Sequence, residues 1–133
     1  MATRHQARRA VIGLLYAHDL GNSNISKFSD EILEEDKIRN RQREFSKRLF
    51  NGTIKNLETI DSEIVKYLNE DWGYDSIGKV EKAILRLGTY EIVIEQTDRR
   101  IVINEAIELA KELADDKAPK FINAVLDNLK VEA

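Results

Sequence analysis

Apolar residues recur every three or four positions along most of the chain, which is the spacing of one face of an α-helix. The pattern is clearest in residues 80–129, in the runs KAILRLGTYEIVIE, IVINEAIELAKELA and KFINAVLDNL. Each run also holds a polar residue close to or within its apolar stripe: Arg86, Asn104 and Asn123. A buried polar group without a hydrogen bond costs about 1–3 kcal/mol. We therefore expect these three side chains to be hydrogen-bonded in a helical core.

The full pattern predicts an all-α bundle of about seven helices. The expected helices cover about residues 3–20, 30–35, 41–57, a stretch capped by Asp61, 77–95, 102–114 and a last helix opened by Pro119. Thr3 is an expected N-cap and Gly21 an expected stop. Proline fits a first helical turn because its missing N–H is not needed there. The run IVI at 101–103 has strand propensity, but it leads straight into a helical pattern.

For two of these helices, the pattern predicts which residues face the solvent or the core. At 100° per residue, the polar side of the first helix is formed by His5, Arg8, Arg9 and Tyr16. Three apolar residues of the fourth helix are expected to face inward: Ile64, Val65 and Leu68.

Composition supports one folded helical domain over residues 1–133. Of the 133 residues, 42% are hydrophobic and 34% are charged, with one proline and six glycines. A chain of this length buries about two thirds of its unfolded surface. It holds no cysteine, which fits a reducing compartment, and no run approaches the length that spans a bilayer. We therefore expect a cytoplasmic protein without membrane contact.

The charges are unevenly distributed, although the formal net charge is only −3. The segment before Asp19 carries three arginines and no acid, and residues 37–48 carry six basic residues against Glu44. The net charge argues against a wholly basic nucleic-acid binder. The two basic segments are where an anionic partner would bind.

The strongest binding signal is the basic face of the first helix. It extends over about 18 Å at 1.5 Å per residue and presents Arg4, His5, Arg8, Arg9 and Tyr16. Guanidinium groups bind phosphates in a bidentate manner, and a tyrosine beside them offers a stacking surface for an unpaired base. The alternative is an ordinary solvated helix face.

Other polar positions have a structural and a functional interpretation. For residues 37–48 we favour a solvated surface of salt bridges. Arg86 would either contact a ligand or form an ion pair inside the bundle, with Glu91 or Glu105 as partner, and we favour the ion pair. Trp72 and Tyr74 would cover a core edge or form a partner site, and we favour the core edge.

Enzyme activity has no positive support in the sequence. There is no nucleophile elbow, phosphate loop or Cys/His spacing for a metal. His5 and His18 point to different sides of the first helix, so they cannot share a metal there. Glu105 and Glu108 form a pair of acids that amphipathic helices carry routinely. We predict no enzyme activity, no metal and no cofactor.

Five segments, in this order and spacing, resemble the NusB family of bacterial transcription antitermination factors. They are ARRAVIGLLYAHDL, NGTIKNLETIDSEI, VEKAILRLGTYEI, VINEAIELAK and KFINAVLD. The resemblance covers nearly the whole chain and implies an all-α fold of two small helical subdomains. It also implies binding of boxA RNA, a short element of ribosomal RNA leaders, together with the small-subunit ribosomal protein NusE. The complex acts with RNA polymerase and promotes read-through of terminators.

The resemblance also implies which residues would make these contacts. The RNA face would include Arg4, His5, Arg8, Arg9 and Tyr16 of the first helix. Three residues at the start of the last helix would lie near it: Lys117, Lys120 and Phe121. The NusE face would centre on Glu81, with Ile77 and Lys82 beside it.

Two alternatives stay open at this point. A similar helical domain precedes the catalytic domain of a ribosomal-RNA cytosine methyltransferase, but 133 residues leave no room for a methyl-donor domain, so we expect the stand-alone factor. The other alternative is a helical protein-interaction module that does not bind RNA. Self-association into a homodimer is a further open question.

Overall fold

The computed structural model of the chain describes residues 2–68 and 74–131. Seven α-helices lie in these ranges: α1 (Arg4–Asp19), α2 (Ser29–Glu35), α3 (Asn40–Lys55), α4 (Leu57–Val65), α5 (Lys79–Thr89), α6 (Arg99–Leu113) and α7 (Ala118–Asn128). Shorter turns precede α2 (η1, Ser23–Phe28), precede α5 (η2, Tyr74–Ser76) and extend α5 as a π-helix (η3, Tyr90–Ile94). The described residues contain no strand, so the prediction of an all-α fold with about seven helices is confirmed.

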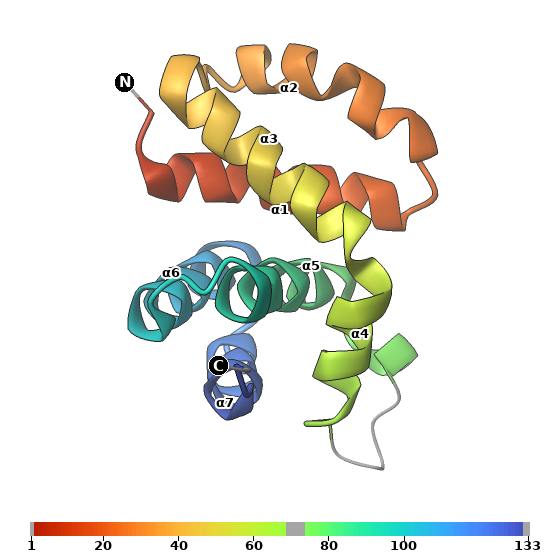
Figure 1. Cartoon of the computed structure of the whole chain (residues 1–133), viewed down its shortest axis with the longest axis vertical. Helices are drawn as coiled ribbons and strands as arrows, with labels where there is room; N and C mark the ends of the chain where they lie inside the picture. The colour runs from red at the N-terminus through yellow and green to blue at the C-terminus, as the bar shows by residue number, and fades with distance from the viewer. Residues whose placement is uncertain (1, 69–73, 132–133) are drawn as a thin grey trace. The chain divides into compact units, whose positions relative to one another are not determined.

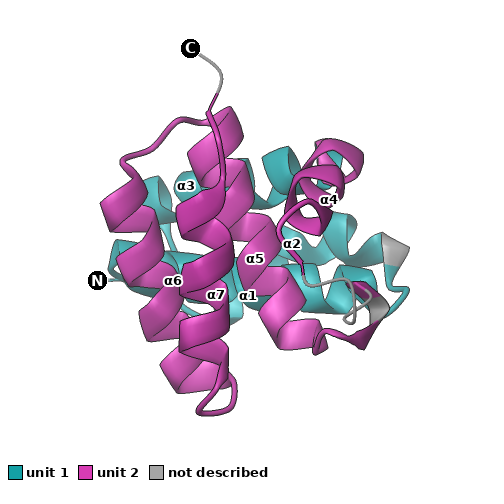
Figure 2. Ribbon diagram, turned by 90° about the horizontal axis from the view of Figure 1, so that it is seen from below, with its two compact units in different colours: residues 1–55 teal, residues 56–133 magenta. Residues whose placement is uncertain are grey.

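The chain divides into two compact units, residues 1–55 and 56–133 (Figures 1 and 2). In the first unit α3 packs along α1, and α2 contacts α3 (Figure 1). Thr3 caps α1 as predicted, in a reciprocal pair with Gln6, and Gly21 follows α1 with φ +102°. The hydroxyl of Ser46 on α3 donates to the carbonyl of Ala7 on α1 at 3.0 Å. A buried hydrogen bond therefore joins the two long helices of this unit within a mainly apolar core.

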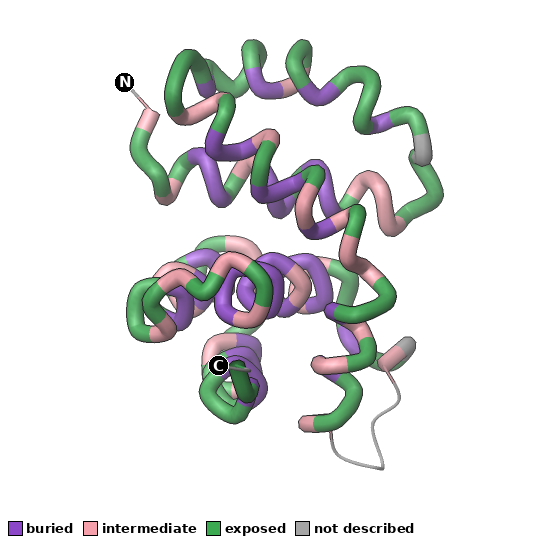
Figure 3. Tube along the Cα trace, viewed as in Figure 1, coloured by how far each residue is buried: buried purple, intermediate pink, exposed green. Residues whose placement is uncertain are grey.

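In the second unit α5 packs against α4, α6 and α7. Most of α5 is buried along its length (Figure 3), as the wide apolar pattern of this segment predicts. Gly88 makes the approach of α7 possible, because a Cβ there would lie 2.9 Å from a methyl carbon of Leu126. Leu85, Ile92 and Ile122 are among the fully buried residues of this core.

Several predictions about individual side chains were wrong. Asn104 and Asn123 are exposed rather than buried, because each lies beyond the edge of its helix's buried stripe. Val65, at the last turn of α4, is 51% exposed instead of facing inward. Asp61 is not an N-cap, because α4 begins earlier, at Leu57. Trp72 lies outside the described residues.

Arg86 forms an ion pair inside the bundle, as predicted, with a partner that we did not predict. Its Nε and Nη2 donate to the two oxygens of Asp61 on α4, each at 2.9 Å. The phenol of Tyr74 donates to the same carboxylate at 2.7 Å. Burial raises the pKa of Tyr74, and the bond to Asp61 raises it further, so this phenol stays a proton donor. The three side chains join α4 to η2 and to the last turn of α5.

A second arginine, Arg99, donates hydrogen bonds to the C-terminal end of α7. The guanidinium of Arg99, at the start of α6, donates to the carbonyls of Leu126 and Asp127 at 3.0 Å and also to that of Leu129. The last carbonyls of a helix have no partner within the helix. Arg99 supplies those donors and so attaches the end of α7 to α6.

No helix in the described ranges is both long enough and apolar enough to cross a membrane.

Replacing Arg86 by methionine tests the ion pair with Asp61. The substitution keeps a long side chain but leaves a half-buried carboxylate without its bidentate donor. We expect the free energy of unfolding to fall by about 2–3 kcal/mol, measured by urea denaturation and circular dichroism. The matched control is Arg100→Met on the exposed start of α6, which should change stability by less than about 0.5 kcal/mol. An equal effect of both substitutions would contradict a structural role for Arg86.

Candidate functional site

One exposed face of α1 carries three of the predicted contact residues. His5, Arg9 and Tyr16 are spaced four and seven residues apart, which places them on the same side of a helix. Arg9 is exposed, Tyr16 is 37% exposed and His5 is half-buried. Gly13, between Arg9 and Tyr16, is exposed as well. This face therefore presents a guanidinium and an aromatic ring to solvent with no large side chain between them.

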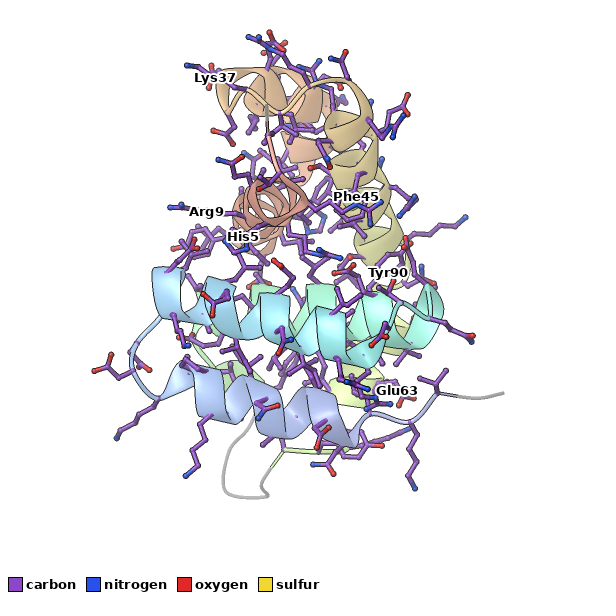
Figure 4. The ribbon with its side chains drawn as sticks, turned by 90° about the vertical axis from the view of Figure 1, so that its left-hand side faces the viewer. His5, Arg9, Lys37, Phe45, Glu63 and Tyr90 are labelled. Atoms are coloured by element: carbon purple, nitrogen blue, oxygen red, sulfur yellow. The ribbon has the colours of Figure 1, made fainter. Side chains whose placement is uncertain are left out.

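The other arginines of α1 lie on a different side of the helix, around an aromatic ring. Phe45 of α3 is contacted by the guanidinium carbons of Arg4, Arg8 and Arg48, at 4.5, 5.2 and 5.4 Å from the ring centre. Figure 4 shows Phe45 and Arg9 on opposite sides of α1. A cation over an aromatic face gains about 0.5–1 kcal/mol at an exposed site and more when water is excluded. Phe45 thus holds several guanidinium groups close together near the start of α1.

The position of Arg8 corrects the sequence-based assignment of its face. We expected Arg8 on the polar side of α1, but only 3% of it is exposed. The aromatic face of Phe45 accommodates the guanidinium, so a cation is tolerated at this buried position. Helical spacing alone could not reveal this, because the partner lies on another helix.

The start of α7, in the second unit, carries the remaining predicted RNA contacts. Lys117 and Lys120 are exposed, and Phe121 is half-buried. Helix N-termini attract anions through their unpaired amides, but here the carboxylate of Asp115 accepts from the amides of Lys117 and Ala118 at 3.0 and 3.1 Å. A phosphate at this end would therefore be bound by the two lysine side chains.

The predicted protein-contact residues surround the start of α5. Glu81 is half-buried in the first turn, and its carboxylate folds back over Gly78, where an added Cβ would lie 1.9 Å from Oε2. Ile77 is 7% exposed and Lys82 is 6% exposed. The ammonium of Lys82 lies 4.6 Å from the centre of the Tyr74 ring. Of the three predicted residues, Glu81 is the most accessible to a partner, because Ile77 and Lys82 are buried.

The second basic segment is largely a surface of salt bridges, as we favoured. Glu34 pairs with Arg39 at 3.1 Å and with Arg43, and Lys47 pairs with Asp30 at 3.0 Å. The hydrogen bond from Arg39, and then that from Arg43, lowers the pKa of Glu34. A lowered carboxyl pKa stabilises the fold above the unfolded value of 4.5, and this contribution is lost as the pH falls through the folded value.

Comparison with known proteins gives consistent matches over nearly the whole chain. The NusB family model matches residues 5–130. A transcription antitermination protein NusB from Sulfurovum sp. (strain NBC37-1) is 73% identical over 127 residues, covering 96% of this chain and 97% of that protein.

Solved structures match the fold as well. T. maritima NusB has a TM-score of 0.85 at 33% identity, covering 95% of this chain and 89% of that one. A chain in the crystal structure of the antitermination factors NusB and NusE in complex with dsRNA has a TM-score of 0.84 at 35% identity, covering 93% of this chain and 92% of that one.

A double-mutant cycle tests the arginine contacts of Phe45. Phe45→Leu removes the ring but keeps an apolar side chain, and Arg4→Met removes one cation. We expect a coupling energy of about 0.5–1 kcal/mol between the two substitutions in urea denaturation. The control pair combines Phe45→Leu with Lys55→Met, an exposed cation about 15 Å further along α3 at 1.5 Å per residue. A coupling of zero in the first pair would show that Arg4 only lies near the ring without stabilising it.

Proposed function

Because the chain belongs to the NusB family, we propose that it is a transcription antitermination factor that binds boxA RNA together with NusE. In this role it acts in the cytoplasm as part of an RNA polymerase antitermination complex and promotes read-through. The observation that carries the proposal is the exposed face of α1, where Arg9 and Tyr16 lie on one side. A similar chain occurs in a solved complex of NusB and NusE with dsRNA, which supports both partners.

The chemistry of the α1 face fits an unpaired RNA strand. Arg9 supplies a planar, permanently charged group for a phosphate. Tyr16 lies about 10 Å along the helix from Arg9 at 1.5 Å per residue and supplies a ring on which a base can stack. Phosphate contacts to arginine give affinity and stacked bases give selectivity for single strands.

The roles of the predicted RNA contacts differ according to their burial. Arg9, Tyr16 and His5 contact the RNA from the exposed face. Arg4 is exposed over the ring of Phe45 and contributes a second cation at the N-terminal end of α1. Arg8 is buried and acts mainly by stabilising this end of the helix. In the second unit Lys117 and Lys120 contact phosphates, and Phe121 offers an additional ring.

Glu81 is the proposed centre of the NusE contact. Its carboxylate lies in the first turn of α5, where the positive end of the helix dipole favours it. Gly78 leaves the space in which this carboxylate is held. The charge is thus fixed in direction before binding, so it suits a basic group on the partner.

Arg9→Gln and Tyr16→Ala test the RNA face. The first should lower affinity for labelled boxA RNA by about tenfold and reduce the salt dependence of log K by about 0.7, the value of one phosphate contact on a single strand. The second should cost about 1–3 kcal/mol of binding free energy through lost stacking. Both are measured by fluorescence anisotropy at several salt concentrations with saturating NusE.

The matched control for Arg9→Gln is Arg100→Gln on the exposed start of α6. This substitution removes the same charge outside the predicted RNA face. The affinity for boxA RNA should stay within about twofold of the wild-type value. Wild-type affinity in both α1 variants would refute the assignment of this face. If the wild-type chain binds NusE but no RNA under any condition, the interaction-module alternative is correct.

Glu81→Lys tests the NusE contact. Reversal of the charge should weaken NusE binding at least about tenfold, because like charges then meet at the contact, as measured by isothermal titration calorimetry. Glu108→Lys makes the same reversal on the exposed side of α6 and should preserve affinity within about twofold. Native affinity of the Glu81→Lys chain would place NusE elsewhere on the surface.

A further inference from the structure

A groove of about 1480 Å³ lies within the first unit, between α1 and the segment that links α2 to α3. The α1 side of this groove includes Arg9, Ala10, Gly13 and Ala17, and the opposite side is formed by residues 36–42. Figure 4 shows the side chains of Arg9 and Lys37 extending to the same side of this unit, Arg9 from α1 and Lys37 from the linking segment.

The walls of the groove are predominantly basic. Arg9, Lys37, Arg39 and Arg41 line it, against Asp36 as the opposing carboxylate among the lining residues. Arg39 is engaged with Glu34. Arg9, Lys37 and Arg41 are all exposed, so their charges face the solvent in and around the groove. Walls that carry positive charge concentrate the electrostatic field between them and attract an anion.

The linking segment is held in a defined conformation. Lys37 and Asn40 have positive φ values of 61° and 55°, which reverse the chain between α2 and α3. Ile38 between them is 2% exposed, its amide donates to the carbonyl of Leu33 at 2.8 Å, and its carbonyl accepts from Nε of Arg43 at 3.0 Å. The backbone that carries Lys37 and Arg41 is therefore anchored, so both cations are presented from fixed positions.

The floor of the groove allows a main chain or a sugar-phosphate backbone to come close to α1. It is formed by the small side of the helix, Ala10, Gly13 and Ala17. A Cβ added at Gly13 would meet no atom within 4 Å. The larger apolar residues of the lining are Leu14, Ile25 and Ile38, which are buried, and Ile32, which is half-buried. The groove therefore combines exposed cations at its walls with a partly apolar interior.

We propose that this groove binds the sugar-phosphate backbone of single-stranded RNA that flanks the boxA element. The inference rests on the proposed RNA-binding function, because Arg9 belongs both to the boxA face of α1 and to the groove. RNA leaving that face would pass Arg9 and then meet Lys37 and Arg41 on the opposite wall. A polyanionic strand matches the exposed cations Arg9, Lys37 and Arg41, and its sugar-phosphate backbone can come close to the small residues of the floor.

The measured quantity is the ratio of two dissociation constants, that of boxA RNA alone to that of boxA RNA extended by unpaired nucleotides on both sides. We expect this ratio to exceed about ten for the wild-type chain with NusE at 0.1 M salt. Lys37→Gln combined with Arg41→Gln should reduce this ratio to about one. For the extended RNA, the slope of log K against log salt concentration should become less steep by about 1.4, the value of two phosphate contacts. Affinity for boxA alone should change by less than about twofold.

A steric variant tests the same groove without changing its charge. Gly13→Leu should fill the floor and bring the ratio close to one, and it should also weaken binding of boxA alone, because Gly13 lies between Arg9 and Tyr16 on the boxA face. Gly13→Ala should preserve both the ratio and the affinity for boxA alone. Both replacements increase helix propensity at an exposed position, so loss of folding is not expected. The control for charge is Lys27→Gln combined with Lys55→Gln, which removes two exposed cations of the same unit that do not line the groove and should leave the ratio unchanged.

The possible outcomes distinguish the groove proposal from the proposed RNA-binding function. Tight binding of boxA with a wild-type ratio of one would overturn the groove proposal and leave the proposed function intact. Absence of any RNA binding would overturn both. An unchanged ratio in both the charge variant and Gly13→Leu would place the flanking RNA elsewhere. Tighter binding of an oligoglutamate peptide than of an RNA of equal charge would assign the groove to an acidic protein segment instead.

Discussion

A buried or half-buried cation needs a partner, because removing it from water without one costs several kcal/mol, and this constraint organises both units of the protein. Arg8 meets the ring of Phe45, and Lys82 meets the ring of Tyr74. Arg86 meets the carboxylate of Asp61, and Arg99 meets the last carbonyls of α7. Each contact joins two helical segments, and all but the one between Lys82 and Tyr74 join segments that are distant in sequence. The basic residues that an RNA-binding protein needs are thus also used to hold its helices together.

The same constraint separates cations that stabilise the fold from cations that can bind a partner. On α1 the division falls between neighbours, because Arg8 is buried at Phe45 while Arg9 is exposed on the face that carries Tyr16. In the second basic segment, Arg43 and Lys47 are engaged by acids, whereas the walls of the groove include Lys37. A modest net charge of −3 is therefore compatible with a locally basic surface in the first unit.

Local spacing predicted the helices well because periodicity and capping are properties of short segments. Thr3 caps α1 as expected. The partners of polar side chains were predicted less well. Asp61 lies 25 residues from Arg86, and only the packing of α4 on α5 brings them together. Asn104 was misassigned because spacing cannot locate the edge of a buried stripe. The groove depends on the reversal of the chain between α2 and α3, which no motif in the sequence announces.

The central claim is that burial divides the arginines into structural and RNA-binding groups, and the side-chain Nε–H signals of arginine report on it directly. The measurement is a two-dimensional NMR titration of the ¹⁵N-labelled chain, saturated with unlabelled NusE, with boxA RNA. We predict that the Nε–H signal of Arg9 shifts strongly, while those of Arg8, Arg86 and Arg99 change little. A large shift of Arg86 or Arg99 with an unchanged Arg9 would contradict the division of roles.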